Sequence, residues 1–288
     1  MIQTTEPITM RSPRGHNPKR PNAIFVELDD GQHGTVEIAS FTKSVPGSES
    51  GADRSQVILI PGGAIGLSTD IEGHGDLFSD TADDCDESLS TEVESGECRP
   101  KALMQVLHRK CLALRTRAAA VICRVQGRRI TLTVAGTPAP VILSGIKVKR
   151  ARAAGSLLGI PGIPQFSTAH FSIKLDDMLV ASSDGVFETE DKSGTPFGPL
   201  HFARALEGYA ERSMAANILK LWDALRAHGP QLDDLSVLMI RRNRGRLSLA
   251  RPAHWNPKTQ SRPASQATHL DQPLSFVSEF CSAQAQHL

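Results

Sequence analysis

Alternating apolar and polar positions predict β-strands through the central part of the chain. "AIFVELDDGQHGTVEIASF" (23–41) reads as two strands around a turn at Asp30 and Gly31, and "SQVILIPGGAIGLST" (55–69) as two more around Pro61 to Gly63. Further apolar runs of strand length are "AAVICRV", "ITLTVAG", "APVIL", "FSIKL", "DMLVASS" and "LSVLMIRR". So many consecutive strands indicate antiparallel sheet rather than alternating βαβ units.

Helical periodicity appears in only two parts of the chain. "PKALMQVLHRKCLALR" (100–115) begins with a proline suited to a first helical turn and carries one apolar stripe. "PLHFARALEGYA" (199–210) and "SMAANILKLWDALRAHG" (213–229) predict two more helices before the last strand. The pattern therefore predicts an α+β fold with a mostly antiparallel sheet structure.

The periodic pattern ends near both termini, which divides the chain into three parts. Residues 1–21 are rich in Pro, Arg and Asn and lack a period, which predicts a flexible N-terminal arm. Residues 22–243 form one block without an obvious linker, and residues 244–288 are polar and interrupted by proline, which predicts a disordered tail. We expect one domain between two loose ends.

Composition narrows the class of protein without naming a function. The 288 residues include 40% apolar and 22% charged side chains, and the formal net charge is +1, so nothing predicts a nucleic-acid or membrane-surface partner. No apolar run approaches the roughly 18 residues of a membrane-spanning helix. The five cysteines form no C-x-x-C pair, which favours a reducing cytoplasm. The basic run "RRNRGR" (241–246) lacks interleaved aromatic residues and is interpreted as a solvated strand end.

Two aspartates stand at equivalent distances from the turn of the second predicted hairpin. Asp53 lies nine residues before Gly62 and Asp70 lies eight residues after it. Antiparallel pairing of the two arms therefore brings these carboxylates together at the open end of the hairpin.

Two more aspartates flank later strands. Asp184 follows the apolar run 178–181, and Asp233 precedes the run 235–240, so antiparallel pairing of these runs would place both carboxylates at one edge. Each aspartate alone could equally close a turn or cap a helix. Four of them at strand ends suit hard divalent cations, which prefer oxygen ligands.

Six short motifs resemble, in order, those of the metal-dependent serine/threonine protein phosphatases (the PPM family), and specifically the bacterial SpoIIE-type branch with its short RsbX-like members. They are "VPGSESGAD", "DIEGHG", "VAGTPAP", "LLGI", "SSDGVFE" and "DDLSVLMIRR", which run from about Val45 to Arg242. "SDGVFE" and "DDLSVLMI" carry the resemblance most strongly. The sequence departs from the family pattern at Ala52, Val134 and Thr137.

The resemblance implies a sandwich of two antiparallel sheets flanked by helices, with two Mn²⁺ or Mg²⁺ ions at one end. It implies that Asp70 bridges both ions, that the carbonyl of Ile71 binds one, and that Asp53, Asp184 and Asp233 complete the shell. Asp233 is expected rather than its neighbour because the family's metal-binding acid is the first of that pair. Water held between two such cations attacks phosphorus directly.

Two features between the motifs leave alternatives open. His74 is a candidate general acid for the leaving group, or a histidine that fills a glycine-flanked turn. The segment 76–97 contains nine acids and no Lys or Arg, so we expect a solvated acidic loop; the alternative is a lid beside the metals that selects a basic partner surface or competes for cations.

Two functions are compatible with the sequence. The first is a cytoplasmic serine/threonine phosphatase acting on a phosphorylated regulatory protein, which the resemblance places in a partner-switching or stress-signalling pathway with an anti-sigma-factor antagonist or STAS-type substrate. The second is a catalytically impaired module of the same fold that binds a phosphoprotein. Retention of Asp53, Asp70, Asp184 and Asp233 favours the enzyme.

Overall fold

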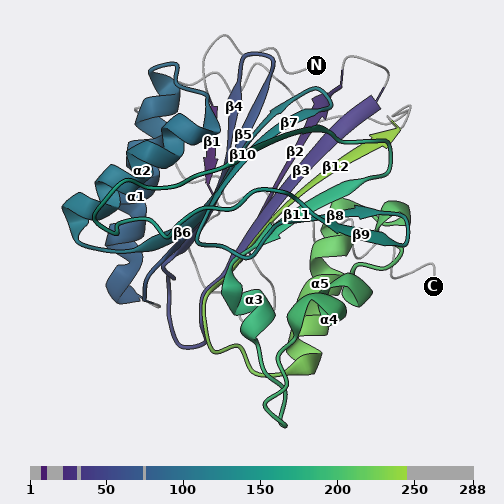
Figure 1. The fold of residues 1–288 in the computed structure, drawn as a ribbon. Helices are drawn as coiled ribbons and strands as arrows, with labels where there is room; N and C mark the ends of the chain where they lie inside the picture. Colours follow the sequence, from purple (N-terminus) through teal and green to yellow (C-terminus); the bar gives the residue numbers. More distant parts are fainter. Residues whose placement is uncertain (1–7, 12–21, 31–33, 74–75, 245–288) are drawn as a thin grey trace, which may run out of the picture. The chain divides into compact units, whose positions relative to one another are not determined.

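Two six-stranded antiparallel sheets form the centre of the protein (Figure 1). The computed structural model describes residues 8–11, 22–30, 34–73 and 76–244. These residues fall within one compact unit, Met1–Arg244. The predicted α+β sandwich flanked by helices is confirmed.

The first sheet has the strand order β1-β4-β5-β6-β7-β10, and each neighbouring pair is antiparallel. Its strands are β1 (Ile8–Arg11), β4 (Asp53–Ile60), β5 (Gly63–Ile71), β6 (Ala118–Gln126), β7 (Arg129–Ala135) and β10 (Thr168–Ser172). β1 lies inside the segment predicted to be a flexible arm and pairs with β4. The prediction of a loose arm is therefore wrong for these four residues, and residues 1–7 and 12–21 lie outside the described residues.

The second sheet has the order β2-β3-β12-β11-β8-β9, again with antiparallel neighbours. Its strands are β2 (Asn22–Asp29), β3 (Gly34–Lys43), β8 (Val141–Ser144), β9 (Lys147–Arg150), β11 (Met178–Ser182) and β12 (Leu235–Arg244). The predicted strand "FSIKL" starts too late, because β10 of the first sheet already begins at Thr168.

Helices cover the outer faces of the two sheets (Figure 1). The first sheet carries α1 (Ser79–Glu94) and α2 (Pro100–Leu114), with the short 3₁₀ helix η1 (Asp76–Phe78) before them. The second carries α3 (Asp184–Glu188), α4 (Gly198–Ala205), η2 (Tyr209–Glu211) and α5 (Met214–His228). None of the helices in the described part of the chain is both long and apolar enough to span a membrane.

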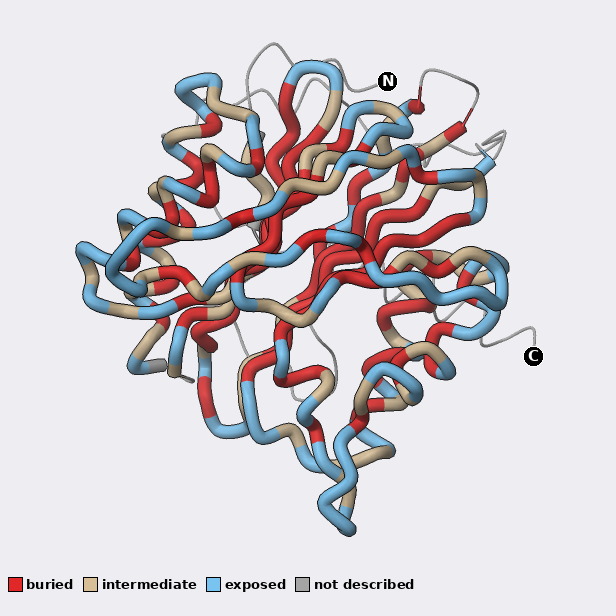
Figure 2. The backbone as a smooth tube through the Cα atoms, viewed as in Figure 1, coloured by how far each residue is buried: buried red, intermediate tan, exposed pale blue. Residues whose placement is uncertain are grey.

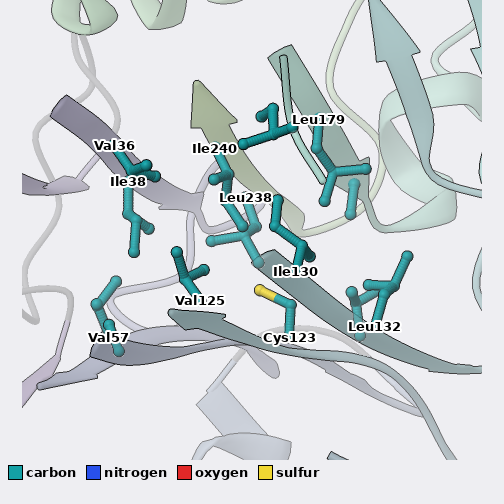
Figure 3. Packing of buried hydrophobic residues seen from close by; sticks show 14 of the residues in the cluster. Val36, Ile38, Val57, Cys123, Val125, Ile130, Leu132, Leu179, Leu238 and Ile240 are labelled. Carbon is teal, nitrogen blue, oxygen red and sulfur yellow. The ribbon is translucent and has the colours of Figure 1, made fainter. Parts of the chain in front are cut away.

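Three apolar layers hold the sheets and helices together, and buried backbone follows the central strands in Figure 2. In the middle layer, Val57, Cys123 and Val125 of the first sheet face Leu238 and Ile240 of the second (Figure 3). The outer layers bury the opposite faces of the same strands against helices. Strands buried on both faces explain why "VILI" and "LSVLMI" read as nearly continuous apolar runs.

The acidic segment 76–97 is mostly helix, so the expectation of a solvated loop is wrong. Ala82, Cys85, Leu89 and Val93 follow one another at helical spacing and are fully buried against the first sheet. Other positions of α1 place acids in solvent, namely Asp80, Asp84, Glu87 and Glu94. The small apolar stripe decides the structure because most of the charges lie on the opposite face of the helix; Asp86, which is 2% exposed, is the exception.

Candidate metal centre

The β4–β5 hairpin places Asp53 directly opposite Asp70, as its length predicted. Asp53 is the first residue of β4 and Asp70 the second-last of β5. Asp53 is only 5% exposed, whereas Asp70 is half-buried. The hairpin alone therefore brings two carboxylates together at the edge of the first sheet.

The second sheet supplies two more carboxylates to the same place. β11 and β12 pair from Met178–Arg241 to Ser182–Val237, so the residues beyond that end of the ladder lie side by side. Asp184 begins α3, and its carboxylate shares a hydrogen bond with Asp70. Asp233 adds negative charge that acts on both Asp53 and Asp70. The structure thus brings the four predicted aspartates to one edge of the sandwich.

Gly185 allows the close approach of α3 to the segment before β12. A Cβ on Gly185 would lie 2.5 Å from the carbonyl oxygen of Asp234 and 3.3 Å from Cβ of Asp233. Any side chain would push α3 away from this backbone. In the "SDG" motif, Asp184 therefore supplies a carboxylate, and the next residue must be glycine because there is no room for a side chain.

Burial and crowding raise the pKa values of the two inner carboxylates. Burial, followed by the charge of Asp234, raises the pKa of Asp53 to about 8, although hydrogen bonds from Ser236 and Ser183 lower it. Burial, followed by the charges of Asp53 and Asp184, raises the pKa of Asp70 to about 10. Fully ionised, the four carboxylates would therefore carry more negative charge than the protein around them offsets.

Asp53 also presents an unused acceptor to this cluster. Its Oδ2 atom is buried and has no hydrogen-bond partner. A buried carboxylate oxygen without a donor is costly unless a cation or a proton accompanies it. Together with an all-oxygen donor set, this observation fits a hard divalent cation.

The two consecutive aspartates before β12 have different surroundings. The carboxylate of Asp234 accepts hydrogen bonds from the backbone N–H groups of Val45 (2.7 Å) and Ala52 (2.6 Å) and is 2% exposed. A Cβ on Gly51 would lie 2.6 Å from Asp234 Oδ2, so glycine is needed beside it. Asp233 is exposed, and its Oδ1 accepts from the N–H of Asp234. Asp234 thus holds the loop before Asp53, while Asp233 faces the cluster.

Ile71 and His74 complete the predicted set. Ile71 follows Asp70 in β5, and its side chain is fully buried under α1 and α2. His74 lies outside the described residues, so its role as general acid stays a prediction. Among the residues that the structure describes, no group of three or more His, Cys, Asp or Glu side chains lies close enough together to hold a metal ion.

Sequence reasoning missed the serines that support the cluster. Ser68 donates to Ser236 across the two sheets at 3.0 Å, and the hydroxyl of Ser183 accepts from the N–H of Ser236 at 3.0 Å. Ser236 and Ser183 also donate to Asp53. The available signal was the presence of hydroxyls within otherwise apolar strands, where a polar group needs a partner.

Comparisons with known proteins agree with this fold. A family model described as "Stage II sporulation protein E (SpoIIE)" matches residues 69–243. Among solved structures, the SiaA-PP2C domain of Pseudomonas aeruginosa superposes with a TM-score of 0.62 at 19% identity, covering 70% of this chain and 84% of that one. The PP2C phosphatase domain of SpoIIE from Bacillus subtilis gives 0.59 at 17% identity, covering 84% and 81%. RsbX in complex with magnesium gives 0.54 at 12% identity, covering 76% and 100%.

The fold and the carboxylate edge define a PP2C-like phosphatase domain. With more than half of its length matched by the family model, the chain belongs to the SpoIIE family of PPM-type phosphatases, as the motifs predicted. No curated protein matches it significantly.

Proposed function

We propose that this protein is a metal-dependent serine/threonine phosphatase that removes phosphate from phosphoserine or phosphothreonine of a regulatory protein. One observation carries the proposal. Four aspartates from both sheets converge on one edge, and the buried Oδ2 of Asp53 has no hydrogen-bond partner there. Membership of the SpoIIE family supports the same activity.

The residues that would hold two Mn²⁺ or Mg²⁺ ions are Asp53, Asp70, Asp184, Asp233 and the carbonyl of Ile71. When bound, such ions supply an activated water and offset charge on the phosphoryl oxygens. RsbX, a structural relative, is described in complex with magnesium, which supports this class of cation.

The chain's own groups prepare the site in three ways. Hydrogen bonds from Ser183 and Ser236 hold the carboxylate of Asp53, and Asp234 fixes the loop before it. Burial, followed by the charges of Asp53 and Asp184, raises the pKa of Asp70 to about 10, so the Asp70 carboxyl keeps its proton at neutral pH in the metal-free protein. That proton must leave before Asp70 can act as a ligand, so we expect cation binding to release protons.

The proposed substrate is a phosphorylated regulatory protein of a partner-switching or stress-signalling pathway, such as an anti-sigma-factor antagonist or another STAS-type protein. Support comes from the relatives, because the SpoIIE structure is described as that of a cell fate determinant. We place the activity in the cytoplasm. The four described cysteines are free thiols, which fits a reducing compartment.

The test is hydrolysis of p-nitrophenyl phosphate and of a phosphothreonine peptide with Mn²⁺, with Mg²⁺ and with chelator. We expect metal-dependent turnover, and a loss of at least about 100-fold in Asp184→Asn because an interaction that stabilises transition-state charge is removed. Asp223→Asn, which changes an exposed aspartate on α5, is the matched control and should keep wild-type activity. Absence of turnover with every metal, in folded protein, would favour a phosphoprotein-binding module instead.

A further inference from the structure

Arg54 is the residue next to Asp53, and its side chain reaches back to the loop that leads into the metal centre. Its Nη1 donates to the carbonyl of Gly51 at 2.5 Å and to the carbonyl of Asp53 at 3.0 Å. The side chain is 15% exposed, so these bonds are made largely away from water. The guanidinium therefore fixes the backbone on both sides of Ala52.

The other two nitrogens of the same guanidinium bind the start of α1. Nη2 donates to the carbonyl and the hydroxyl of Ser79 at 2.9 and 2.8 Å, and Nε donates to Asp83 at 3.0 Å. Ser79 is the first residue of α1, and Asp83 lies one turn later. One side chain thus joins the Asp53 loop to a helix.

Strand geometry explains why the adjacent residues Asp53 and Arg54 have different roles. Successive side chains of a strand point to opposite faces of the sheet. Asp53 shares its face with Val57 and Leu59, which pack between the sheets, whereas Arg54 shares its face with Ile58 and Ile60, which pack under α1 and α2. The carboxylate therefore enters the cluster while the guanidinium anchors the same backbone to the helical layer.

We propose that Arg54 is a positioning residue of the metal centre, which holds the 51–53 backbone against α1 so that the Asp53 carboxylate stays in the cluster. This inference rests on the proposed function, because it concerns the same cation site. All three guanidinium nitrogens of Arg54 donate to protein acceptors. In these bonds Arg54 contacts the backbone of Asp53 but none of the four cluster carboxylates.

The sign of the effect on cation affinity separates positioning from simple charge. Removing a positive charge beside a cation site would by itself strengthen cation binding, because it removes a Coulombic repulsion. Removing a group that positions a ligand weakens binding, typically about 10- to 100-fold for partners behind metal ligands. The two explanations therefore predict opposite changes.

The first experiment measures Mn²⁺ binding by isothermal titration calorimetry for wild type, Arg54→Met and Arg54→Lys. We expect roughly 10-fold weaker binding in Arg54→Met. Arg54→Lys should also bind more weakly than wild type, because an ammonium keeps the charge but cannot reproduce the five hydrogen bonds to three backbone carbonyls and two side-chain oxygens. The Mn²⁺ concentration that gives half-maximal hydrolysis should rise in parallel. The kcat at saturating Mn²⁺ should change by less than about twofold, because Arg54 affects cation binding and not the hydrolytic step.

A matched control removes a different arginine near the same sheet edge. Arg117 is exposed and pairs with Glu72, two residues after Asp70. Arg117→Gln removes a nearby charge without touching the 51–53 backbone, so its Mn²⁺ affinity should equal or slightly exceed that of wild type. Asp83→Asn provides a milder variant that removes one ionic partner of Arg54 and leaves the guanidinium in place.

The second experiment needs neither metal nor activity. Amide hydrogen exchange of metal-free protein should be faster in Arg54→Met for peptides covering 44–54 and the start of α1, while peptides from α5 keep wild-type exchange. Unchanged exchange in these peptides, or Mn²⁺ affinity equal to or above that of wild type, would overturn the inference. A wild type that neither binds Mn²⁺ nor hydrolyses phosphoesters would overturn the proposed function, and the exchange result would then decide alone whether Arg54 ties the loop to α1.

Discussion

The protein has two acidic regions, and they differ in what their acids do. α1 is dense in acids, yet Asp80, Asp84, Glu87 and Glu94 are exposed on its outer side. The edge of the sandwich gathers fewer acids, drawn from four separate places in the sequence, and burial with mutual repulsion raises the pKa values of Asp53 and Asp70. The density of acids along the sequence is therefore a poor indicator of a metal site. The convergence of acids from distant strands is a better one.

Neighbouring basic groups make the same distinction. On α1, Asp84 lies 3.6 Å from Lys110 and Asp83 lies 3.0 Å from Arg54, so these two acids have cationic partners. In the cluster, Asp70 instead shares a hydrogen bond with another carboxylate, Asp184. Carboxylates that are already paired with basic side chains do not need a cation to offset their charge. Carboxylates that face one another do, and are therefore the better candidates for a cation site.

The largest expected contrast is in the rate of hydrolysis. Asp70→Asn should lower metal-dependent turnover by at least about two orders of magnitude, because it removes the carboxylate proposed to contact both cations. Asp84→Asn, the same chemical change on the exposed face of α1, should stay within about twofold of wild type. Steady-state kinetics on a phosphothreonine peptide measures both. Equal losses in the two variants would show that the acids of α1 and those of the sandwich edge do not differ in their contribution to catalysis.

A smaller contrast concerns stability without metal. Since the folded-state pKa values of Asp53 and Asp70 are about 8 and 10 against an ordinary value of 3.8, wild type binds more protons folded than unfolded between those limits. As far as these two groups determine it, the free energy of unfolding without metal should therefore be highest at about pH 4 and below. It should fall as the pH rises towards 8 to 10.

Asp70→Asn removes one of these groups and should stabilise the metal-free protein. The gain should be larger at pH 8.5 than at pH 5.5, on the order of 1–3 kcal/mol at the higher pH. Urea unfolding in chelator at both pH values measures it, with Asp84→Asn, the same change on the exposed face of α1, as the control. A variant less stable than wild type at pH 8.5 would show that the carboxylates do not repel one another in the fold.

The smallest effect is expected when the outer face of α1 is neutralised. The double variant Asp84→Asn/Glu87→Gln changes only exposed side chains, so the free energy of unfolding should change by less than about 0.5 kcal/mol. Thermal unfolding and Mn²⁺ titration measure its stability and cation affinity. A weakened Mn²⁺ affinity would revive the interpretation of this segment as a lid that acts on the metals.

Hairpin arithmetic explains why part of the site was predictable from the sequence. The distances of Asp53 and Asp70 from the Pro61 to Gly63 turn set their register, and the structure pairs them directly. Asp184 and Asp233 followed in the same way from the ends of two apolar runs that pair antiparallel. Such predictions need only the period of a strand and the direction of pairing.

Other features depended on tertiary contacts that local pattern does not encode. α1 was missed because its acidic residues outnumber the four apolar residues of its buried side, which run from Ala82 to Val93. α3 was missed because five residues are too few for a helical period, and β1 because it is a four-residue strand that depends on β4 for its hydrogen bonds. Arg54 looked ordinary, since its acceptors on α1 lie 25 to 29 residues further along the chain.

We expect the cations to bind at the sandwich edge and not on α1. Anomalous diffraction from crystals soaked in Mn²⁺ would locate them, with Asp70→Asn crystals as the control. Two Mn²⁺ peaks are expected among Asp53, Asp70, Asp184 and Asp233, with reduced occupancy in the variant. Peaks confined to the exposed face of α1, or the same two peaks at full occupancy in Asp70→Asn, would contradict it.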